Sequence, residues 1–286
     1  MSAQGPMTGR IARGRSLLFV PGHRPERFVK AARSAADVLI LDLEDSVPAV
    51  EKAAAREAIA REWPRLQSSG VAVVVRMNSL ESDQSALDLT LIRKLSSVPA
   101  VMVPKAESAQ ALAGLHRQLG GVDSIPIIES AAGYAALPTL AGAPGVARLA
   151  IGHIDFMADT GFECDSGQTE LAPLRFAVAM ATRLNRLAPA VDGVTVEIGD
   201  EEKLRQDVRR SLRFGFGGKL CIHPRQVDVV HQAMMPTEGE LEWARKVVAA
   251  SAAAGGAAVQ VDGRMVDLPV VLQAHRTLGR AAIRAE

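Results

Sequence analysis

The segment Val38-Leu-Ile-Leu-Asp-Leu-Glu-Asp45 is a continuous apolar run that ends in acidic residues. The same order recurs in Ile125-Pro-Ile-Ile-Glu129 and in Ala150-Ile-Gly-His-Ile-Asp155. Another run, Val71-Ala-Val-Val-Val-Arg76, ends in a basic residue instead. Apolar runs without alternation are typical of strands buried on both faces of a parallel sheet. The pattern therefore places charged residues at one end of a parallel sheet, where α/β enzymes bind their substrates.

Eight such runs alternate with amphipathic segments along most of the chain. The predicted strands are 16–20, 38–43, 71–77, 101–103, 125–128, 147–152, 193–197 and 219–222. The predicted helices are 25–35, 49–63, 83–95, 108–119, 131–140, 171–187, 201–214 and 226–235. Eight strands, each followed by a helix, predict an α/β protein with a (β/α)8 TIM barrel. An open doubly wound sheet is the alternative, but Phe19-Val-Pro-Gly22 lacks the expected G-x-G-x-x-G fingerprint.

The pattern changes after residue 235. We expect the barrel to occupy residues 1–235, with 1–15 as a flexible arm, and residues 236–286 to form a C-terminal helical and hairpin extension. A helix is predicted over 238–254 and another over 269–282, with a hairpin between them at Asp262-Gly263. This extension exceeds what eight βα units need, so it either caps the barrel or contacts a neighbouring subunit.

Composition excludes several function classes. The chain has 286 residues with 33 Lys+Arg against 32 Asp+Glu, and only 3% are aromatic. Balanced charge and few stacking side chains argue against a nucleic-acid partner. We expect no membrane segment, because no apolar stretch approaches the length of about 20 residues that a span requires. Two cysteines and the absence of an apolar leader predict a cytoplasmic enzyme or binding protein.

Glu129 and Asp155 are the best candidates for metal ligands. Each follows a predicted strand, and the two strands are neighbours in a barrel, so both side chains are expected at its mouth. Mg2+ binds one or two protein carboxylates and fills its octahedron with water and substrate oxygens. Asp155 has a second interpretation, as a cap of the helix that follows it.

Glu44, Asp45 and Arg76 are candidates for a supporting or catalytic shell. Glu44 and Asp45 crowd the end of one strand, and need a cation or donors to compensate their charges. Arg76 is placed to donate to a carboxylate or a developing oxyanion. A structural ion pair between Arg76 and Glu44 or Asp45 is the alternative.

Two further groups of cations are less specific. Arg24, Arg27 and Lys30 follow the first strand and suit either phosphate binding or a solvated helix face. Lys105 follows another strand and suits either a Schiff base or an ion pair with a carboxylate.

Seven segments at successive strand ends resemble the citrate lyase β-subunit-like family of the HpcH/HpaI aldolase superfamily. They run in order along nearly the whole chain: Ser16-Leu-Leu-Phe-Val-Pro-Gly22, Asp42-Leu-Glu-Asp-Ser-Val-Pro48, Val75-Arg-Met-Asn78, Val103-Pro-Lys-Ala-Glu107, Ile127-Ile-Glu-Ser130, Gly152-His-Ile-Asp-Phe156 and Gly218-Lys-Leu-Cys-Ile-His-Pro224. Ile154 departs from the Glu that many members carry before this Asp-Phe pair, so the resemblance leaves the acyl group open.

The resemblance implies a Mg2+-dependent lyase that cleaves or forms a C–C bond in a 3-hydroxyacyl-CoA of the citryl, malyl or citramalyl type. By position it implies the following roles: Glu129 and Asp155 as Mg2+ ligands, Arg76 as a catalytic group at the substrate oxygens, and Phe19, Arg24 and Lys30 at coenzyme A.

The resemblance also implies that Asp267 is an acid/base placed over a neighbouring subunit's site, hence a homo-oligomer (trimer or hexamer). We expect Glu44 to support the metal-bound water, and the backbone from Gly152 to Asp155 to orient the substrate carboxylate. Two alternatives remain open: a class II aldolase that cleaves a free 4-hydroxy-2-oxo acid, and a non-catalytic β-subunit component of a lyase complex.

Overall fold

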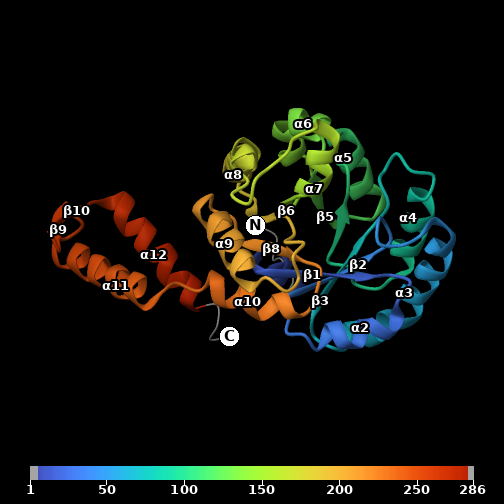
Figure 1. The fold of residues 1–286 in the computed structure, drawn as a ribbon, viewed down its shortest axis with the longest axis horizontal. Coiled ribbons are helices and arrows are strands. Elements are labelled where there is room, and N and C mark those ends of the chain that lie inside the picture. Colours follow the sequence, from blue (N-terminus) through green and yellow to red (C-terminus); the bar gives the residue numbers. More distant parts are fainter. Residues whose placement is uncertain (1–5, 283–286) are drawn as a thin grey trace. The chain divides into compact units, whose positions relative to one another are not determined.

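A computed structural model describes residues 6–282. Contacts between residues group the chain into two compact units, with the division between Val230 and His231. The first unit is a closed barrel of eight parallel strands in the order β1 to β8 (Figure 1). The strands are β1 Ser16–Pro21, β2 Val38–Asp42, β3 Ala72–Arg76, β4 Ala100–Val103, β5 Asp123–Ile128, β6 Arg148–Ile151, β7 Ala188–Asp192 and β8 Gly218–Cys221. The predicted (β/α)8 barrel is confirmed.

The helices of this part of the chain surround the strands (Figure 1). They are α1 Pro6–Arg13, α2 Pro25–Ala32, α3 Lys52–Gln67, α4 Ser85–Lys94, α5 Ala109–Gln118, α6 Ala131–Ala141, α7 His153–Thr160, α8 Ala172–Leu184, α9 Glu201–Arg213 and α10 Arg225–Met234, with short 3-10 helices η1 Ala49–Glu51 and η2 Thr169–Leu171. Several begin with a side-chain cap. Ser108, Ser130 and Asp200 each accept a hydrogen bond from an N–H in the first turn of the helix that follows.

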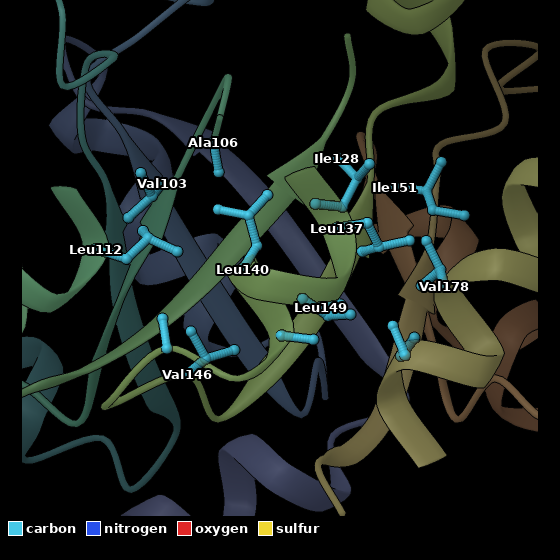
Figure 2. Packing of buried hydrophobic residues seen from close by; sticks show 14 of the residues in the cluster. Val103, Ala106, Leu112, Ile128, Leu137, Leu140, Val146, Leu149, Ile151 and Val178 are labelled. Atoms are coloured by element: carbon cyan, nitrogen blue, oxygen red, sulfur yellow. The ribbon is translucent and has the colours of Figure 1, made fainter. Parts of the chain in front are cut away.

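Alternate residues of the strands fill the barrel interior. This inner cluster contains Leu17, Val38, Ile40, Ala72, Val74, Ala100, Met102, Ile125, Ile127, Ala150, Val191 and Leu220. Because side chains alternate between the two faces of a strand, the intervening residues point outward to the helices. Figure 2 shows this outer layer, in which Val103, Ile128 and Ile151 of the strands pack with Leu140 and Val178 of the helices. Both faces of the sheet are thus buried, as the continuous apolar runs indicated.

The seventh strand differs from the prediction. We expected it over 193–197, whereas β7 is Ala188–Asp192, and Val191 pairs with Gly218 of β8. Pro189 obscures this strand in the sequence, although proline is tolerated near a strand's start. The β-branched residues that suggested the later strand lie in a loop, where the Thr195 hydroxyl donates to Asp207 at 2.7 Å.

The predicted arm over residues 1–15 also differs, within the described residues. Residues 6–13 form α1, and Ile11 is buried. The buried guanidinium of Arg148 donates to the carbonyl oxygens of Ile11 and Gly14, at 3.0 and 2.7 Å. These contacts join positions far apart in sequence, so the local pattern carries no sign of them. Residues 1–5 of the expected arm lie outside the described part.

The second unit contains α11 Glu238–Ala253, the antiparallel hairpin of β9 Val259–Val261 and β10 Arg264–Val266, and α12 Leu268–Ala282. Asp262 and Gly263 both have positive φ, as a type I′ hairpin turn requires. Ala244, Val247, Val266 and Ala274 form its buried core. The division falls within α10, while the sequence predicted a boundary after residue 235. Across residues 6–282, the structure contains no helix with the length and apolar character of a membrane span.

The outer apolar layer provides a stability test. Leu140 near the end of α6 is fully buried, while Leu184 at the end of α8 is 77% exposed. Leu140→Ala should lower the free energy of unfolding by about 2–5 kcal/mol, because it leaves a cavity. Leu184→Ala, the matched control, should change it by less than about 0.5 kcal/mol. Urea unfolding followed by circular dichroism measures both, and equal losses would contradict the assignment of this layer as the core.

Candidate active site

The alternation that fills the barrel also determines which residues reach its mouth. Phe19, Arg76 and Glu129 continue the inward-facing positions of β1, β3 and β5. With Gly152 and Asp155 they line a cavity of about 80 Å3 at the carboxyl ends of the strands. This volume is enough for several water molecules or a few substrate atoms. Five residues predicted for the site therefore share one cavity.

Arg76 is the most heavily paired residue of this cavity. Its Nε and Nη2 donate to the two carboxylate oxygens of Asp42, each at 2.7 Å, and its Nη1 lies 2.8 Å from Glu44 Oε2. The guanidinium also lies over the Phe19 ring, 4.7 Å from the centroid. Burial would lower the pKa of Arg76, but Asp42 and Glu44 outweigh burial and raise it. Both hydrogen bonds of the guanidinium go to Asp42, whereas its contact with Glu44 is an ion pair without a hydrogen bond, so not all of its five N–H groups are used.

Asp42 was not among the predicted site residues. It is fully buried, and lies opposite Arg76 in the parallel register of β2 and β3. Burial alone would raise the pKa of Asp42, but the charge and hydrogen bonds of Arg76 hold it below its usual range. The sequence carried a weak signal, because Asp42 shares the inward-facing parity of Val38 and Ile40. The register that joins it to Arg76 is a tertiary property.

Glu44 joins Arg76 to Lys105. The Nζ of Lys105 donates to Glu44 Oε1 at 3.0 Å, while Asp45, 56% exposed at its side chain, lies 4.0 Å from Arg76. Burial raises the pKa of Glu44, despite the opposing charge of Arg76. Burial would lower the pKa of Lys105, but its hydrogen bond to Glu44 raises it. Because a Schiff-base lysine needs a lowered pKa, the structure favours the ion pair for Lys105.

Glu129 is buried beside a glycine that makes room for it. A Cβ on Gly152 would lie 2.7 Å from the Cβ of Glu129, and closer still to its Oε2. The backbone N–H of Lys105 donates to the other oxygen, Oε1, at 2.7 Å. Burial raises the pKa of Glu129 to about 8; this hydrogen bond opposes the rise, and the negative charge of Asp155 adds to it. A desolvated carboxylate next to a second carboxylate is suited to bind a cation.

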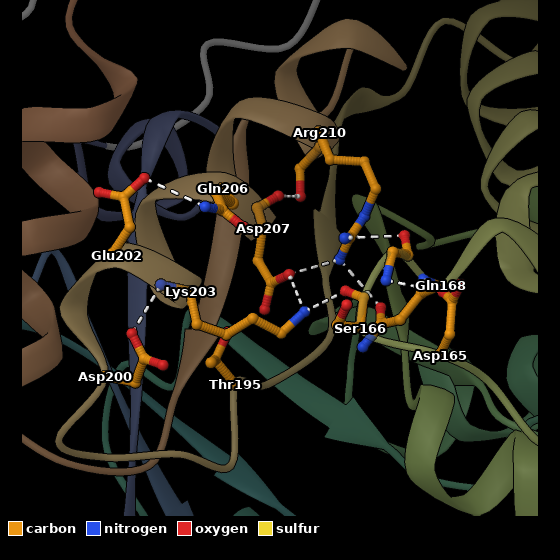
Figure 3. A network of polar contacts seen from close by, with 12 residues as sticks. Asp165, Ser166, Gln168, Thr195, Asp200, Glu202, Lys203, Gln206, Asp207 and Arg210 are labelled. Carbon is orange, nitrogen blue, oxygen red and sulfur yellow. Dashed lines mark hydrogen bonds and ion pairs between the residues drawn. The ribbon is translucent and has the colours of Figure 1, made fainter.

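Asp155 lies in the first turn of α7, a helix that the sequence did not predict as a separate element. The end of α7 leads into a loop that is held by Lys203 and Arg210 of α9 (Figure 3), and also by Arg175 of α8. Arg175 and Arg210 donate to Gln168 Oε1 at 2.7 and 2.9 Å, and Lys203 donates to the Ser166 carbonyl. Asp207 lies between Lys203 and Arg210, at 3.1 and 2.7 Å. The network restrains the loop that follows the helix carrying Asp155.

The start of α7 bears on the expected carboxylate contact. The N–H of Gly152 donates to the Ile128 carbonyl at 3.1 Å, so it is already used. The first N–H groups of a helix have no acceptor within the helix, and the positive end of its dipole favours anions. The N–H groups from His153 to Asp155 are therefore the ones that suit a substrate carboxylate.

The donor set fits a hard cation that needs few protein ligands. Within residues 6–282, no group of three or more His, Cys, Asp or Glu side chains is placed to hold a metal ion. Glu129 and Asp155 line the same cavity, which leaves space for water or substrate oxygens. Mg2+ accepts such an arrangement, whereas structural Zn2+ takes four protein ligands.

The remaining predicted residues lie outside this cavity. Arg24 precedes α2 with its side chain half exposed, 3.9 Å from Glu26, and Lys30 follows on the same helix. Burial lowers the pKa of His223, and the positive charges of Arg225 and Lys30 lower it further. Asp267 belongs to the second unit, between β10 and α12.

A larger cavity of about 710 Å3 lies between α6, α7 and α8. Tyr134, Phe156 and Phe162 line it with edge-to-face ring contacts, and its charged residues are Glu163 and Glu170. The smaller cavity holds the carboxylates of Glu129 and Asp155 and the guanidinium of Arg76, so we assign the chemistry to that one.

Comparison with known proteins agrees with this geometry. Residues 15–224 match the family described as HpcH/HpaI aldolase/citrate lyase. The chain belongs to this family. Residues 176–284 also match a C–C bond lyase family of the TIM-barrel fold, and the protein is accordingly a carbon–carbon lyase.

Individual members of the HpcH/HpaI family are similar along almost their whole length. A citrate lyase subunit beta-like protein of Mycobacterium tuberculosis is 37% identical, with 94% of this chain and 96% of that protein covered. An L-malyl-CoA/beta-methylmalyl-CoA lyase of Cereibacter sphaeroides is 32% identical, with 91% and 92% covered. A crystal structure of CitE from M. tuberculosis with magnesium, acetoacetate and coenzyme A superposes with a TM-score of 0.83 at 35% identity, covering 95% and 99%.

The buried pair in this HpcH/HpaI member leads to a pH-dependent prediction. Asp42→Asn should lower the free energy of unfolding at pH 7 by about 3–5 kcal/mol, because it removes a buried charge partner of Arg76. Because the pKa of Asp42 is lowered in the folded state, its carboxylate adds to the free energy of unfolding at pH values above the unfolded-state pKa of about 3.9. This stabilisation is lost as the pH falls through the folded-state pKa. The difference between the variant and the wild type should therefore shrink in acid.

Urea unfolding at pH 7 and at stepwise lower pH measures this difference. Asp45→Asn is the matched control, since Asp45 is mostly exposed and only 4.0 Å from Arg76. Its effect should stay within about 0.5 kcal/mol. A gap for Asp42→Asn that does not narrow with acidity would contradict the lowered pKa.

Proposed function

We propose that the protein is a Mg2+-dependent lyase that cleaves a 3-hydroxyacyl-CoA of the citryl, malyl or citramalyl type into an oxo acid and acetyl-CoA, or catalyses the reverse condensation. The observation that carries the proposal is the sharing of one cavity by the Glu129–Asp155 pair and the partly free guanidinium of Arg76. Support also comes from a relative named as a malyl-CoA lyase, and from a structure named with magnesium and coenzyme A.

In this proposal Glu129 and Asp155 hold the Mg2+, with water and the acid part of the substrate completing its coordination. When bound, Mg2+ supplies Lewis-acid polarisation of the substrate oxygens. The N–H groups at the start of α7 orient the substrate carboxylate. The N–H groups of Arg76 that Asp42 does not use stabilise the enolate oxyanion of the thioester that forms when the C–C bond breaks. Asp42 and Glu44 hold Arg76 in place for this role.

The rest of the reaction involves residues other than the carboxylate pair and Arg76. In the cleavage direction water takes the proton that the substrate hydroxyl loses as it becomes a carbonyl, and protonated Asp267 delivers a proton to the enolate carbon; the synthetic direction reverses both transfers. We propose that Asp267 does so at a neighbouring subunit's site, in a cytoplasmic homo-oligomer. Phe19, Arg24 and Lys30 bind coenzyme A, whose phosphates suit the cations just before and on α2.

A coupled assay of citryl-, malyl- and citramalyl-CoA, with and without Mg2+, tests the function. The wild type should turn over at least one thioester only with Mg2+. Glu129→Gln should lose both Mg2+ binding by calorimetry and turnover, whereas Asp267→Asn should lose turnover and keep Mg2+ binding. Equal turnover in EDTA would refute the metal role, and activity only on free 4-hydroxy-2-oxo acids would favour a class II aldolase. An inactive chain that gains activity with partner subunits would favour the β-subunit interpretation.

Gly152 offers a test that needs no substrate. Gly152→Ala should weaken Mg2+ binding by about 10- to 100-fold, because the new methyl group displaces the Glu129 carboxylate. Its φ of −106° suits alanine, so the effect is steric. Gly199→Ala is the matched control, since nothing lies within 4 Å of its Cβ position. Titration calorimetry with Mg2+ measures both, and unchanged affinity for Gly152→Ala would contradict the placement of Glu129.

A further inference from the structure

Lys105 follows β4 in a backbone conformation that lysine rarely adopts. Its φ is +46°, in the left-handed region that costs free energy for residues with a Cβ. Such conformations persist where surrounding contacts determine them, and they concentrate at functional sites. The contacts of Lys105 therefore indicate what the conformation achieves.

The backbone of Lys105 contacts the expected metal ligand. Its N–H donates to Glu129 Oε1 at 2.7 Å, and the next N–H, of Ala106, donates to the Ile127 carbonyl at 3.4 Å. A carboxylate with one oxygen held in this way can rotate little. Oε2, the oxygen that lies against Gly152, is left for a ligand in the cavity.

The side chain of Lys105 contacts Glu44, which is an ion-pair partner of Arg76. Its Nζ lies 3.0 Å from Glu44 Oε1, and Glu44 Oε2 lies 2.8 Å from Arg76. The side chain is 44% exposed, while Glu44 and Glu129 are buried. Lys105 thus links Arg76 to Glu129. The contacts run from Asp42 to Arg76, Glu44, Lys105 and finally Glu129.

We propose that Lys105 is a positioning residue: its left-handed backbone orients Glu129 for the cation, and its ammonium group holds Glu44 against Arg76. The inference rests on the proposed Mg2+ site, but concerns a residue that the proposed reaction does not use. It accounts for both the unusual φ and the ion pair of one side chain.

The backbone role of Lys105 is tested by a series of substitutions at this position. All of them remove the ammonium group, and they differ in how readily the new residue adopts a positive φ. Lys105→Gly and Lys105→Asn accept the left-handed region, whereas Lys105→Val opposes it. In titrations with Mg2+ alone, Gly and Asn should agree within about threefold, and Val should bind about tenfold more weakly. Equal affinities for Gly and Val would overturn the backbone role. If Lys105→Val does not fold, Lys105→Ala takes its place, and it should bind Mg2+ more weakly than Lys105→Gly.

The side-chain part is tested by kinetics on the thioester that the wild type turns over. Lys105→Met should lower kcat about tenfold and Lys105→Arg should restore part of it, because an ion pair with Glu44 is regained. The double variant Lys105→Met with Glu44→Gln should have a kcat little lower than that of either single variant. If the two reductions in kcat multiply instead, Lys105 does not act through Glu44. A wild type that binds no Mg2+ would refute the proposed function itself. If the wild type binds Mg2+ but the Lys105 variants all bind it equally well, only the backbone role is refuted.

Discussion

Inward alternation along a closed set of parallel strands is the constraint on which this site depends. Ile125 and Ile127 fill the barrel interior, so the next inward position, Glu129, reaches the mouth. Val74 is followed in the same way by Arg76. The barrel closes through pairing of β1 with β8, and closure brings the carboxyl ends of all eight strands around one opening. Residues distant in sequence then become neighbours.

Placing charges at that opening requires each of them to be compensated. Desolvation penalises Asp42, Glu44, Arg76 and Glu129, because each has lost most of its water. The bidentate pair of Asp42 and Arg76 compensates best, since two hydrogen bonds add to the charge attraction. Glu129 is compensated least, as one backbone N–H is its donor and its pKa rises to about 8. This contrast separates the paired charges of the site from Glu129, the carboxylate that we propose binds the cation.

The supporting contacts come from backbone as often as from side chains. The missing side chain of Gly152 makes room for Glu129, and the left-handed turn at Lys105 directs an N–H to the same carboxylate. In addition, Lys203 and Arg210 hold the loop after α7 by donating to backbone carbonyl groups and to the side chain of Gln168 (Figure 3). Rigid support of this kind keeps catalytic groups within the small tolerance that their geometry allows.

The sequence by itself determined the barrel, seven of its eight strands, and the strand-end location of Glu129, Arg76 and Glu44, because apolar runs and their terminal charges are local patterns. It also indicated the hairpin and helices of the second unit. Only the tertiary structure decided the strand of Ala188–Asp192, the pairing of Asp42 with Arg76, the use of the Lys105 N–H and the anchoring of α1 by Arg148. Each depends on strand register or on contacts between distant segments, which periodicity along one segment does not encode.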